Sequence, residues 1–207
     1  MDPLLFYSWA AFWLTYLIGG CLLYDDADAV LLPNTVVSHK LLFRTVGLNA
    51  LFSFLFIPIA SLIPTLIVVP DSLYGFAIHV LLSLLIGDAI FYSTHRLMHH
   101  PWFYKYHKLH HNFSKPHMFA GVYAHPVEFI ISNHLAMMIP FKLVQIHHPW
   151  WIIIESIVVS TNILKSHSGY ESIWTGSPIH NLHHDKMNCN YGFLYIHDLM
   201  FGTLRLS

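Results

Sequence analysis

The sequence predicts an all-α integral membrane protein, a helical bundle of about four to five membrane segments with a cytosolic, histidine-rich di-metal cap. Three observations predict it. First, 55% of the 207 residues are hydrophobic and only 10% are charged, too few charges to cover a soluble globule. Second, several apolar runs approach the roughly 20 residues that a helix needs to cross a bilayer. Third, 18 residues are histidine, and ten of these form a spaced series after the third apolar run.

The first predicted helix covers residues 4–24, an uncharged run of spanning length. We expect it to be retained, because no small-residue cleavage site follows it. Three aspartates end it: Asp25, Asp26 and Asp28. The second run, residues 41–69, is longer and contains Pro58 and Pro64, so it is either one kinked span or a helix with a re-entrant turn. Residues 1–72 are therefore expected to be N-terminal membrane anchor helices.

The third predicted helix, residues 73–94, leads directly into the first histidines. Two shorter apolar runs follow at residues 127–141 and 150–164, on either side of a turn at 147–149. They predict a helical hairpin. Because two successive crossings return the chain to the side it left, the histidine-bearing segments before and after the hairpin are expected to meet on one face of the membrane.

Basic residues gather in the same two histidine-bearing segments. They are Arg96, Lys105, Lys108, Lys115, Lys165, Lys186 and Arg205. The positive-inside rule therefore predicts that the metal-bearing face is cytosolic. A net charge of −1 without a basic run gives no sign of nucleic-acid binding, and two cysteines are too few for a disulfide framework or a thiolate metal site. We expect residues 1–207 to form a single domain with a catalytic core at about 85–205.

The histidines recur at spacings that suit metal ligation. In HxxxH and HxxHH, positions i, i+3 and i+4 of a helix share one face, so two or three imidazoles aim at a common point. Neutral imidazole suits iron, copper, zinc or nickel, and about eight to ten of them exceed what one ion can use. The number of histidines therefore favours two metals. The series comprises His95, His99, His107, His110, His111, His125, His167, His180, His183 and His184.

Two polar residues of the third predicted helix share a face with the first histidine. Asp88 and Tyr92 precede His95 by seven and three residues. A carboxylate there could accept the second ring N–H of a ligating histidine and so fix its tautomer. The alternative is that Asp88 only pairs with a neighbouring helix. We favour the role beside the metal ligands, because a buried acid near a bilayer is costly and more often functional.

Five motifs carry a resemblance to a known family. They are HRLMH at 95–99, HKLHH at 107–111, YAHPVE at 123–128, HSGY at 167–170 and HNLHH at 180–184. In order and spacing they look like the fatty acid hydroxylase superfamily of membrane-bound, histidine-rich di-iron oxygenases, over about residues 85–205. Within it, the YAHPVE and HSGY motifs look closest to the sterol desaturase and sterol 4-methyl oxidase branch.

The resemblance implies a chemistry as well as a fold. It implies two iron ions held by all ten histidines of the series, O2 as co-substrate, and two electrons from an external donor such as cytochrome b5 with its NADH- or NADPH-dependent reductase. The implied reaction oxidises a C–H bond of a lipid, a sterol or a fatty acyl chain, at the endoplasmic reticulum membrane. Glu128 is expected either to contact a ligating histidine or to be an acid at a helix N-terminus.

Other functions remain open on the sequence alone. A sterol or fatty-acyl desaturase would use the same di-iron site, and its product would lose two hydrogens instead of gaining an oxygen. A non-catalytic metal-binding membrane protein or an inactive homologue would keep the histidines without turnover. A metal transporter is disfavoured because it needs polar ligands near the bilayer midplane, whereas these boxes lie at helix ends.

The other eight histidines are not expected to be metal ligands, apart from a weaker case for His100. Surface or interfacial roles are expected for His39, His117, His134, His147 and His148. His79 lies within an apolar run and is expected to bond a neighbouring helix. His100 extends the first box, and His197 stands where the family often carries an aromatic residue.

Overall fold

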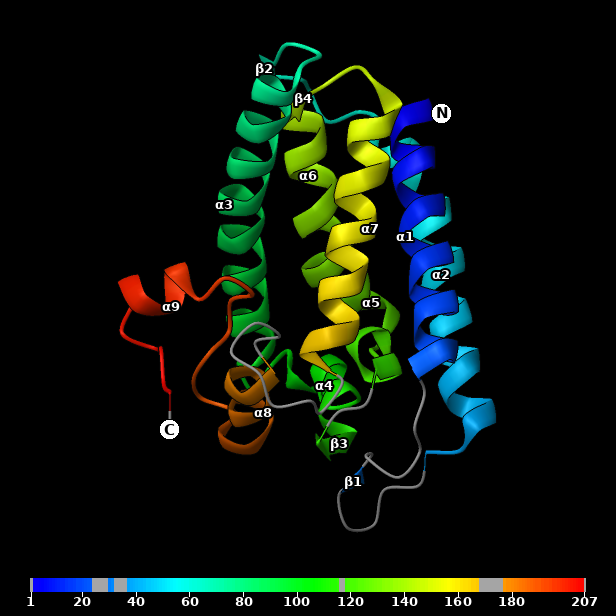
Figure 1. The fold of residues 1–207 in the computed structure, drawn as a ribbon. Helices are drawn as coiled ribbons and strands as arrows, with labels where there is room; N and C mark the ends of the chain where they lie inside the picture. Colours follow the sequence, from blue (N-terminus) through cyan, green and yellow to red (C-terminus); the bar gives the residue numbers. More distant parts are fainter. Residues whose placement is uncertain (1, 24–29, 32–36, 116–117, 168–176, 207) are drawn as a thin grey trace.

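The computed structural model describes residues 2–23, 30–31, 37–115, 118–167 and 177–206 (Figure 1). Long helices run side by side along one axis, and the short segments that carry most of the histidines gather at one end of them (Figure 1). The predicted all-α membrane-type bundle is confirmed. Asp25, Asp26, Asp28 and His117, together with the last three residues of the HSGY motif, lie outside the described part of the chain.

Helix α1 (Pro3–Leu23) follows the first predicted run closely. It packs along α7 (Pro149–Ser166), and small hydroxyl side chains allow the two backbones to approach. The Ser156 hydroxyl donates to Ser8 Oγ at 2.9 Å, and the Ser160 hydroxyl donates to the Phe12 carbonyl at 3.0 Å. These bonds satisfy polar groups that would otherwise be buried without partners.

Helix α2 (His39–Ala60) begins at an N-cap, Ser38, whose side chain accepts the Leu41 N–H. It ends at Ala60, two residues after Pro58, so residues 41–69 do not form one helix. The chain continues into a short strand, β2 (Ile67–Val68), which pairs in parallel with β4 (Val144–Gln145) at the end of the bundle away from the histidines (Figure 1).

Helix α3 (Leu73–Met98) begins at the N-cap Ser72 and is longer than predicted. It continues through His95 and ends with His99 as its C-cap. The first histidine box is therefore the last turn of α3, which extends from the membrane span into the cap.

The predicted hairpin is present, but its first arm is not a regular α-helix. It consists of α5 (Pro126–Glu128), a π-helical segment η4 (Phe129–His134) and α6 (Leu135–Leu143). The second arm is α7, which begins with Pro149 at its first turn and has His148 as its N-cap. The turn lies at the predicted residues.

The short elements surround the histidines. They are α4 (Tyr104–His107), the 3₁₀ helices η2 (His110–Asn112) and η3 (Met118–Val122), β3 (Phe113–Lys115), which pairs antiparallel with β1 (Val30–Leu31), α8 (Ser177–Lys186) and α9 (Ile196–Met200). Two contacts fix η3 to the membrane helices: Tyr16 Oη donates to the Met118 carbonyl at 2.7 Å, and Asn49 Nδ2 donates to the Val122 carbonyl at 2.9 Å.

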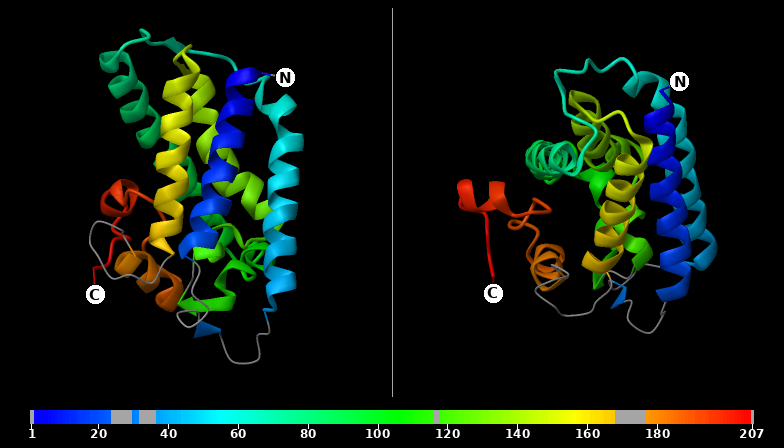
Figure 2. Two further views of the ribbon diagram at one scale, coloured as in Figure 1. Left: turned by 45° about the vertical axis from the view of Figure 1, so that its right-hand side comes forward. Right: turned by 45° about the horizontal axis from the view of Figure 1, so that its top comes forward.

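Three helices of the described chain are long and apolar enough to cross a membrane: α1, α2 and α3. Their outward faces expose large apolar side chains, as lipid-facing surfaces do, among them Leu14, Ile18, Leu51, Leu55, Ile59, Leu81 and Leu85. The interrupted α5–α6 arm and α7 do not meet this criterion, yet they run beside the other three (Figure 2).

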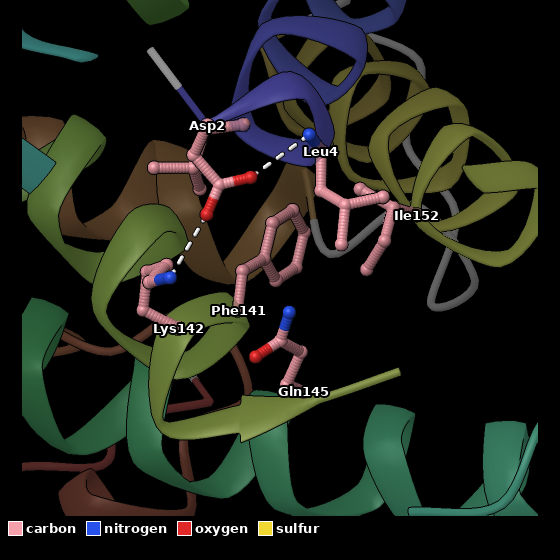
Figure 3. A pocket seen from close by; sticks show the side chains of 7 residues that line it. Asp2, Leu4, Phe141, Lys142, Gln145 and Ile152 are labelled. Carbon is pink, nitrogen blue, oxygen red and sulfur yellow. Dashed lines mark hydrogen bonds and ion pairs between the residues drawn. The ribbon is translucent and has the colours of Figure 1, made fainter. Parts of the chain in front are cut away.

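A small cavity lies at the end of the bundle away from the histidines, where an ion pair joins Asp2 to Lys142 at 2.8 Å (Figure 3). Its volume of about 10 Å³ leaves room for no more than one water molecule. It is therefore a packing gap at the helix ends and not a lipid site.

Candidate metal centre

Nine histidines from five elements converge at one end of the bundle. Two long helices contribute at their C-terminal ends: α3 brings His95 and His99, and α7 brings His167 as its C-cap. The short helices contribute the others, namely His107 on α4, His110 and His111 on η2, and His180, His183 and His184 on α8.

These histidines form two groups. The first group contains His95, His99, His107, His111 and His183; the second contains His110, His167, His180 and His184. Within each group, the candidate ligand nitrogens all lie within 4.8 Å of one another. The groups adjoin, because the ring of His184 in the second group lies 4.6 Å from that of His111 in the first, centroid to centroid. Most of the histidines predicted as ligands of two metals therefore lie in two neighbouring clusters, each of which could hold a metal ion.

The sequence predicted that the imidazoles of one box aim at a common point. For both HxxHH boxes this prediction is wrong, because each of these boxes is divided between the two groups. On α8, His180 and His184 belong to the second group, whereas His183 belongs to the first. The reason is helical geometry: at about 100° per residue, positions i and i+4 differ by about 40°, whereas i+3 and i+4 differ by about 100°.

The ring nitrogens of the first group have defined roles. His95 Nδ1 lies 2.7 Å from the Tyr191 carbonyl oxygen, and His183 Nδ1 lies 2.7 Å from that of Cys189. A carbonyl oxygen can only accept, so Nδ1 donates in both residues and Nε2 keeps its lone pair. His107 Nδ1 likewise lies 2.7 Å from Glu128 Oε1.

The Nε2 atoms of this group face one another, and those of His95 and His107 are both left with lone pairs. His95 Nε2 lies 3.2 Å from His107 Nε2, and His183 Nε2 lies 3.2 Å from His99 Nε2. Two lone pairs at this separation repel unless a cation lies between them. At a metal–nitrogen distance of about 2.0–2.1 Å, ligand nitrogens are about 2.9 Å apart at right angles and about 3.4 Å apart at the tetrahedral angle. The residues present therefore fit a metal ion.

The second group repeats this spacing with four imidazoles. His180 Nε2 lies 2.9 Å from His167 Nε2 and 3.1 Å from His184 Nε2. His167 Nδ1 points back to the Ile163 carbonyl of α7 at 3.0 Å. All four rings are buried, whereas the first group reaches the surface through the half-buried ring of His99.

Burial keeps these imidazoles neutral. It lowers the pKa of His183 to about 4 and that of His99 to about 3. Burial, followed by the proximity of other histidines, also lowers the pKa well below its usual range for His107, His110, His111, His180 and His184. Neutral imidazole is the form that binds metals, so the cap holds its ligands in the binding form at physiological pH.

The turn after α8 supplies the two carbonyls that orient His95 and His183, and two aspartates hold it. Asp198 accepts the Tyr191 N–H at 2.8 Å and the Gly192 N–H at 2.6 Å. Asp88 accepts the Phe193 and Leu194 N–H groups at 3.0 and 2.8 Å. A Cβ on Gly192 would lie 2.8 Å from Asp88 Oδ1 and 3.0 Å from Asp198 Oδ2, so both carboxylates can approach only a glycine.

The expected partner of Asp88 was wrong. The Asp88 carboxylate pairs with His197, whose Nδ1 lies 2.6 Å from Oδ2. It does not pair with a histidine of either group. The reason is that Asp88 lies two turns before His95 on α3, level with the 193–197 segment. Asp88 therefore acts on His95 indirectly, through the turn that carries the Tyr191 carbonyl.

Tyr92 is similarly displaced from the metal ligands. Its hydroxyl accepts from Arg96 at 2.7 Å, and its ring stacks on Phe201 at 5.4 Å. Glu128, in contrast, is buried directly against His107, although it also lies in the first turn of α5. Of the two roles expected for Glu128, the structure shows the contact with a histidine of the first group.

His125 lies outside both groups, which corrects its place among the ten predicted ligands. Its Nδ1 accepts the Val127 N–H at 3.2 Å, which makes it the N-cap of α5, and its ring lies beside Tyr106. The neighbouring proline and the start of the helix account for this position. His100 also stays outside, where its Nδ1 is 3.4 Å from the Trp102 backbone nitrogen.

Two further histidines, His79 and His134, are buried outside both groups. His79 bonds neighbouring elements as expected: Nδ1 lies 2.6 Å from the Val144 carbonyl oxygen, and Nε2 lies 2.6 Å from Glu155 Oε2 on α7. His134, expected at the surface, is buried in η4 against Phe56 instead. The sequence offered one signal for the missed Glu155, since it is the only acid in an otherwise uncharged apolar run.

The comparison with protein families agrees with this centre. The model of the fatty acid hydroxylase family matches residues 80–203, which span both histidine groups and the turn after α8. The chain belongs to the fatty acid hydroxylase family. The resemblance expected from the motifs is thereby confirmed.

Several curated members of the fatty acid hydroxylase family are similar to this chain. Fatty acid hydroxylase domain-containing protein 2 of Homo sapiens is 34% identical over 137 residues, 64% of this chain and 40% of its own length. A fatty acid hydroxylase of Mycosarcoma maydis is 31% identical over 181 residues, 83% and 47% of the two chains. Cholesterol 25-hydroxylase of Rattus norvegicus is 33% identical over 144 residues, 62% and 47%. The chain thus spans about half the length of these relatives. No solved structure matches it.

Proposed function

We propose that this protein is a membrane-bound non-haem di-iron oxidoreductase that hydroxylates a C–H bond of a lipid with O2 and two electrons. The observation that carries the proposal is the pair of adjoining imidazole groups, five and four histidines, at the end of a bundle of apolar helices. Nitrogen-only ligation of this kind suits iron among other first-row metals. Two irons bound there would supply the O2 chemistry that attacks an unactivated C–H bond.

The chain's own residues prepare this centre. Tyr191, Cys189 and Glu128 accept the Nδ1 protons of three histidines, which fixes the tautomers and directs Nε2 inward. Burial excludes water from the second group in particular, since its four histidines are all buried. Asp88 and Asp198 hold the turn from which two of these acceptors come. The residues therefore bind, orient and desolvate, and the oxidising power belongs to the metals.

Two kinds of observation support a lipid substrate, which we propose to be a sterol. The relatives include a fatty acid hydroxylase and a cholesterol 25-hydroxylase, whose names specify lipids. The candidate centre also lies at the ends of α3 and α7, directly below apolar helices that expose leucine and isoleucine outward (Figure 1). A substrate that stays in the bilayer would reach this end of the bundle without crossing water.

The proposal includes an orientation and an electron donor. Six basic residues lie in or close to the elements at the histidine end: Arg96, Lys105, Lys108, Lys165, Lys186 and Arg205. By the positive-inside rule they support a cytosolic cap, here at the endoplasmic reticulum membrane. The same charges would favour docking of an acidic donor such as cytochrome b5, itself reduced by an NADH- or NADPH-dependent reductase.

The experiment compares lipid extracts from cells that express the protein with extracts from cells that express His110→Ala, under ample iron and oxygen. A product heavier by one oxygen in the first sample alone supports hydroxylation. A product lighter by two hydrogens identifies a sterol or fatty-acyl desaturase on the same centre. Identical extracts would overturn the enzymatic proposal and leave a non-catalytic metal-binding protein.

A further inference from the structure

The short helix α9 has an inverted distribution of polar and apolar side chains. Its acid, Asp198, is fully buried, and the His197 ring is mostly covered and paired with Asp88. Its apolar residues point outward: Leu199 is 70% exposed, Met200 69% and the adjoining Phe201 59%. A helix on the surface of a water-soluble domain has the opposite arrangement, so water is the wrong solvent for this face.

The position of α9 indicates which solvent fits. Figures 1 and 2 show α9 apart from the other helices, on the far side of α3 from α1 and α2. It is attached at Asp88, which precedes Met98, the last residue of α3, by ten residues, or about 15 Å along the helix axis. Because α3 is a candidate membrane span over its whole length, this depth lies inside the span.

The apolar face of α9 also continues a surface of α3. Leu81 and Leu85 are exposed on α3, and Phe201 stacks on Tyr92 of the same helix. The two polar residues of α9 have their partners in protein: Asp198 accepts from the Gly192 turn, and His197 pairs with Asp88. Polar groups that bond inward beside apolar groups that face outward are what hydrocarbon surroundings require.

We propose that α9 is embedded in the bilayer beside α3, with Leu199, Met200 and Phe201 in contact with lipid acyl chains. The helix then anchors the cap to the membrane a few residues from the Tyr191 carbonyl that orients His95. The hydrocarbon boundary reaches the edge of the metal centre in this arrangement. The inference concerns the surroundings of α9 and does not depend on which reaction the centre performs.

The test places a nitroxide spin label at Leu199→Cys or Met200→Cys, in a Cys21→Ser background, with the protein in phosphatidylcholine nanodiscs. Cys189 is buried and remains. Oxygen concentrates in hydrocarbon and a nickel chelate in water, so their relative collision rates with the label report its depth. Leu81→Cys on α3 is the lipid-facing control, and Asp185→Cys on α8 is the exposed control in the cap.

We expect both α9 labels to collide more with oxygen than with nickel, as the label at position 81 does. Nickel-dominated collisions, as at position 185, would overturn the proposal. So would low access to both reagents together with dipolar broadening that disappears on dilution with unlabelled protein, because that result would mean that a second copy of the chain covers α9. The metal content of each labelled protein verifies that the cap is folded.

Discussion

His110 and His111 are neighbours in the sequence, yet their imidazoles belong to different metal groups, with ring centroids 5.6 Å apart and planes at 85°. The same division occurs on α8 between His184 and His183. Each HxxHH box therefore serves both groups, and the two candidate metals share their supporting helices. This arrangement would place two metals side by side without a separate domain for each.

The division of ligands makes the groups respond differently to single substitutions. We expect His110→Ala to lower the metal content from about two ions per chain toward one, because the second group has only four imidazoles. His111→Ala should lower the metal content less, because the first group would retain four imidazoles. Elemental mass spectrometry on the purified variants measures both. His125→Ala is the control and should keep both metals; a loss of one metal there would place His125 back among the ligands.

The turn after α8 tolerates no side chain at Gly192. We expect Gly192→Ala to push the turn away from Asp88 and Asp198 and so displace the Tyr191 carbonyl from His95. Loss of such an outer contact lowers metal affinity by about 10- to 100-fold. Competition with a chelator of known affinity measures the change. Gly47→Ala is the matched control, because a Cβ at Gly47 would have no atom within 4 Å. Gly202→Ala would not serve, because Gly202 has a positive φ that alanine adopts only with strain. An unchanged affinity for Gly192→Ala would contradict the positioning role of the turn.

Glu128 acts on the metal site through His107. Burial raises the pKa of Glu128 well above its usual range, so the contact with His107 does not depend on a full negative charge. Glu128→Gln keeps an oxygen that can accept the Nδ1 proton, so we expect a smaller loss of metal affinity than for Glu128→Ala. For Glu128→Ala the loss should reach about 10- to 100-fold. The same chelator competition ranks the two variants. Equal effects, or none, would show that the acid serves only the start of α5.

The pair of His79 and Glu155 joins α3 to α7 far from the metal centre. Removing one partner leaves a buried polar group unpaired, so His79→Leu should destabilise the protein by about 3–5 kcal/mol. The double variant, His79→Leu with Glu155→Leu, should recover much of this loss. Thermal unfolding in mild detergent measures both. A double variant that is less stable than either single one would contradict a simple pairing role.

Acid should destabilise the metal-free cap. The pKa of His183 is lowered to about 4 in the folded protein, against about 6.5 in the unfolded chain, so the unfolded state binds more protons between these values. The other buried histidines of both groups are shifted in the same direction. Stability is therefore full above about pH 6.5 and falls as the pH drops toward 4. The unfolding midpoint of chelator-treated protein at pH 7.5 and pH 5 tests this; a midpoint that rises on acidification would contradict it.

Much of the fold could be predicted because hydropathy and length are local properties. The helices α1 and α3 and the turn at residues 147–149 follow directly from apolar runs and a Pro149 start. The π-helical segment from Phe129 could not be predicted, since no simple residue pattern distinguishes it from an α-helix. The pairing of β2 with β4 could not be predicted either, because it joins segments that are far apart in the sequence.

The residue types of the candidate site could be predicted from the sequence, but the hydrogen-bond partners of those residues could not. The boxes indicated eight of the nine clustered histidines, and the ninth, His167, came with the family resemblance. The acceptors on Tyr191 and Cys189 are backbone carbonyls, which no residue type reveals. His125 followed the same family pattern and lies elsewhere, because it caps a helix. Asp88 was singled out as a partner of a ligating histidine, but its ring partner is His197, which depends on how the 193–197 segment folds against α3.

The central claim is a centre for two irons, and metal content per chain tests it most directly. Protein purified in mild detergent after expression in iron-replete medium is analysed by elemental mass spectrometry. The nine converging imidazoles predict close to two irons per chain. A single zinc, or no metal in a protein that is otherwise folded, would contradict the di-iron centre and with it the proposed oxygen chemistry.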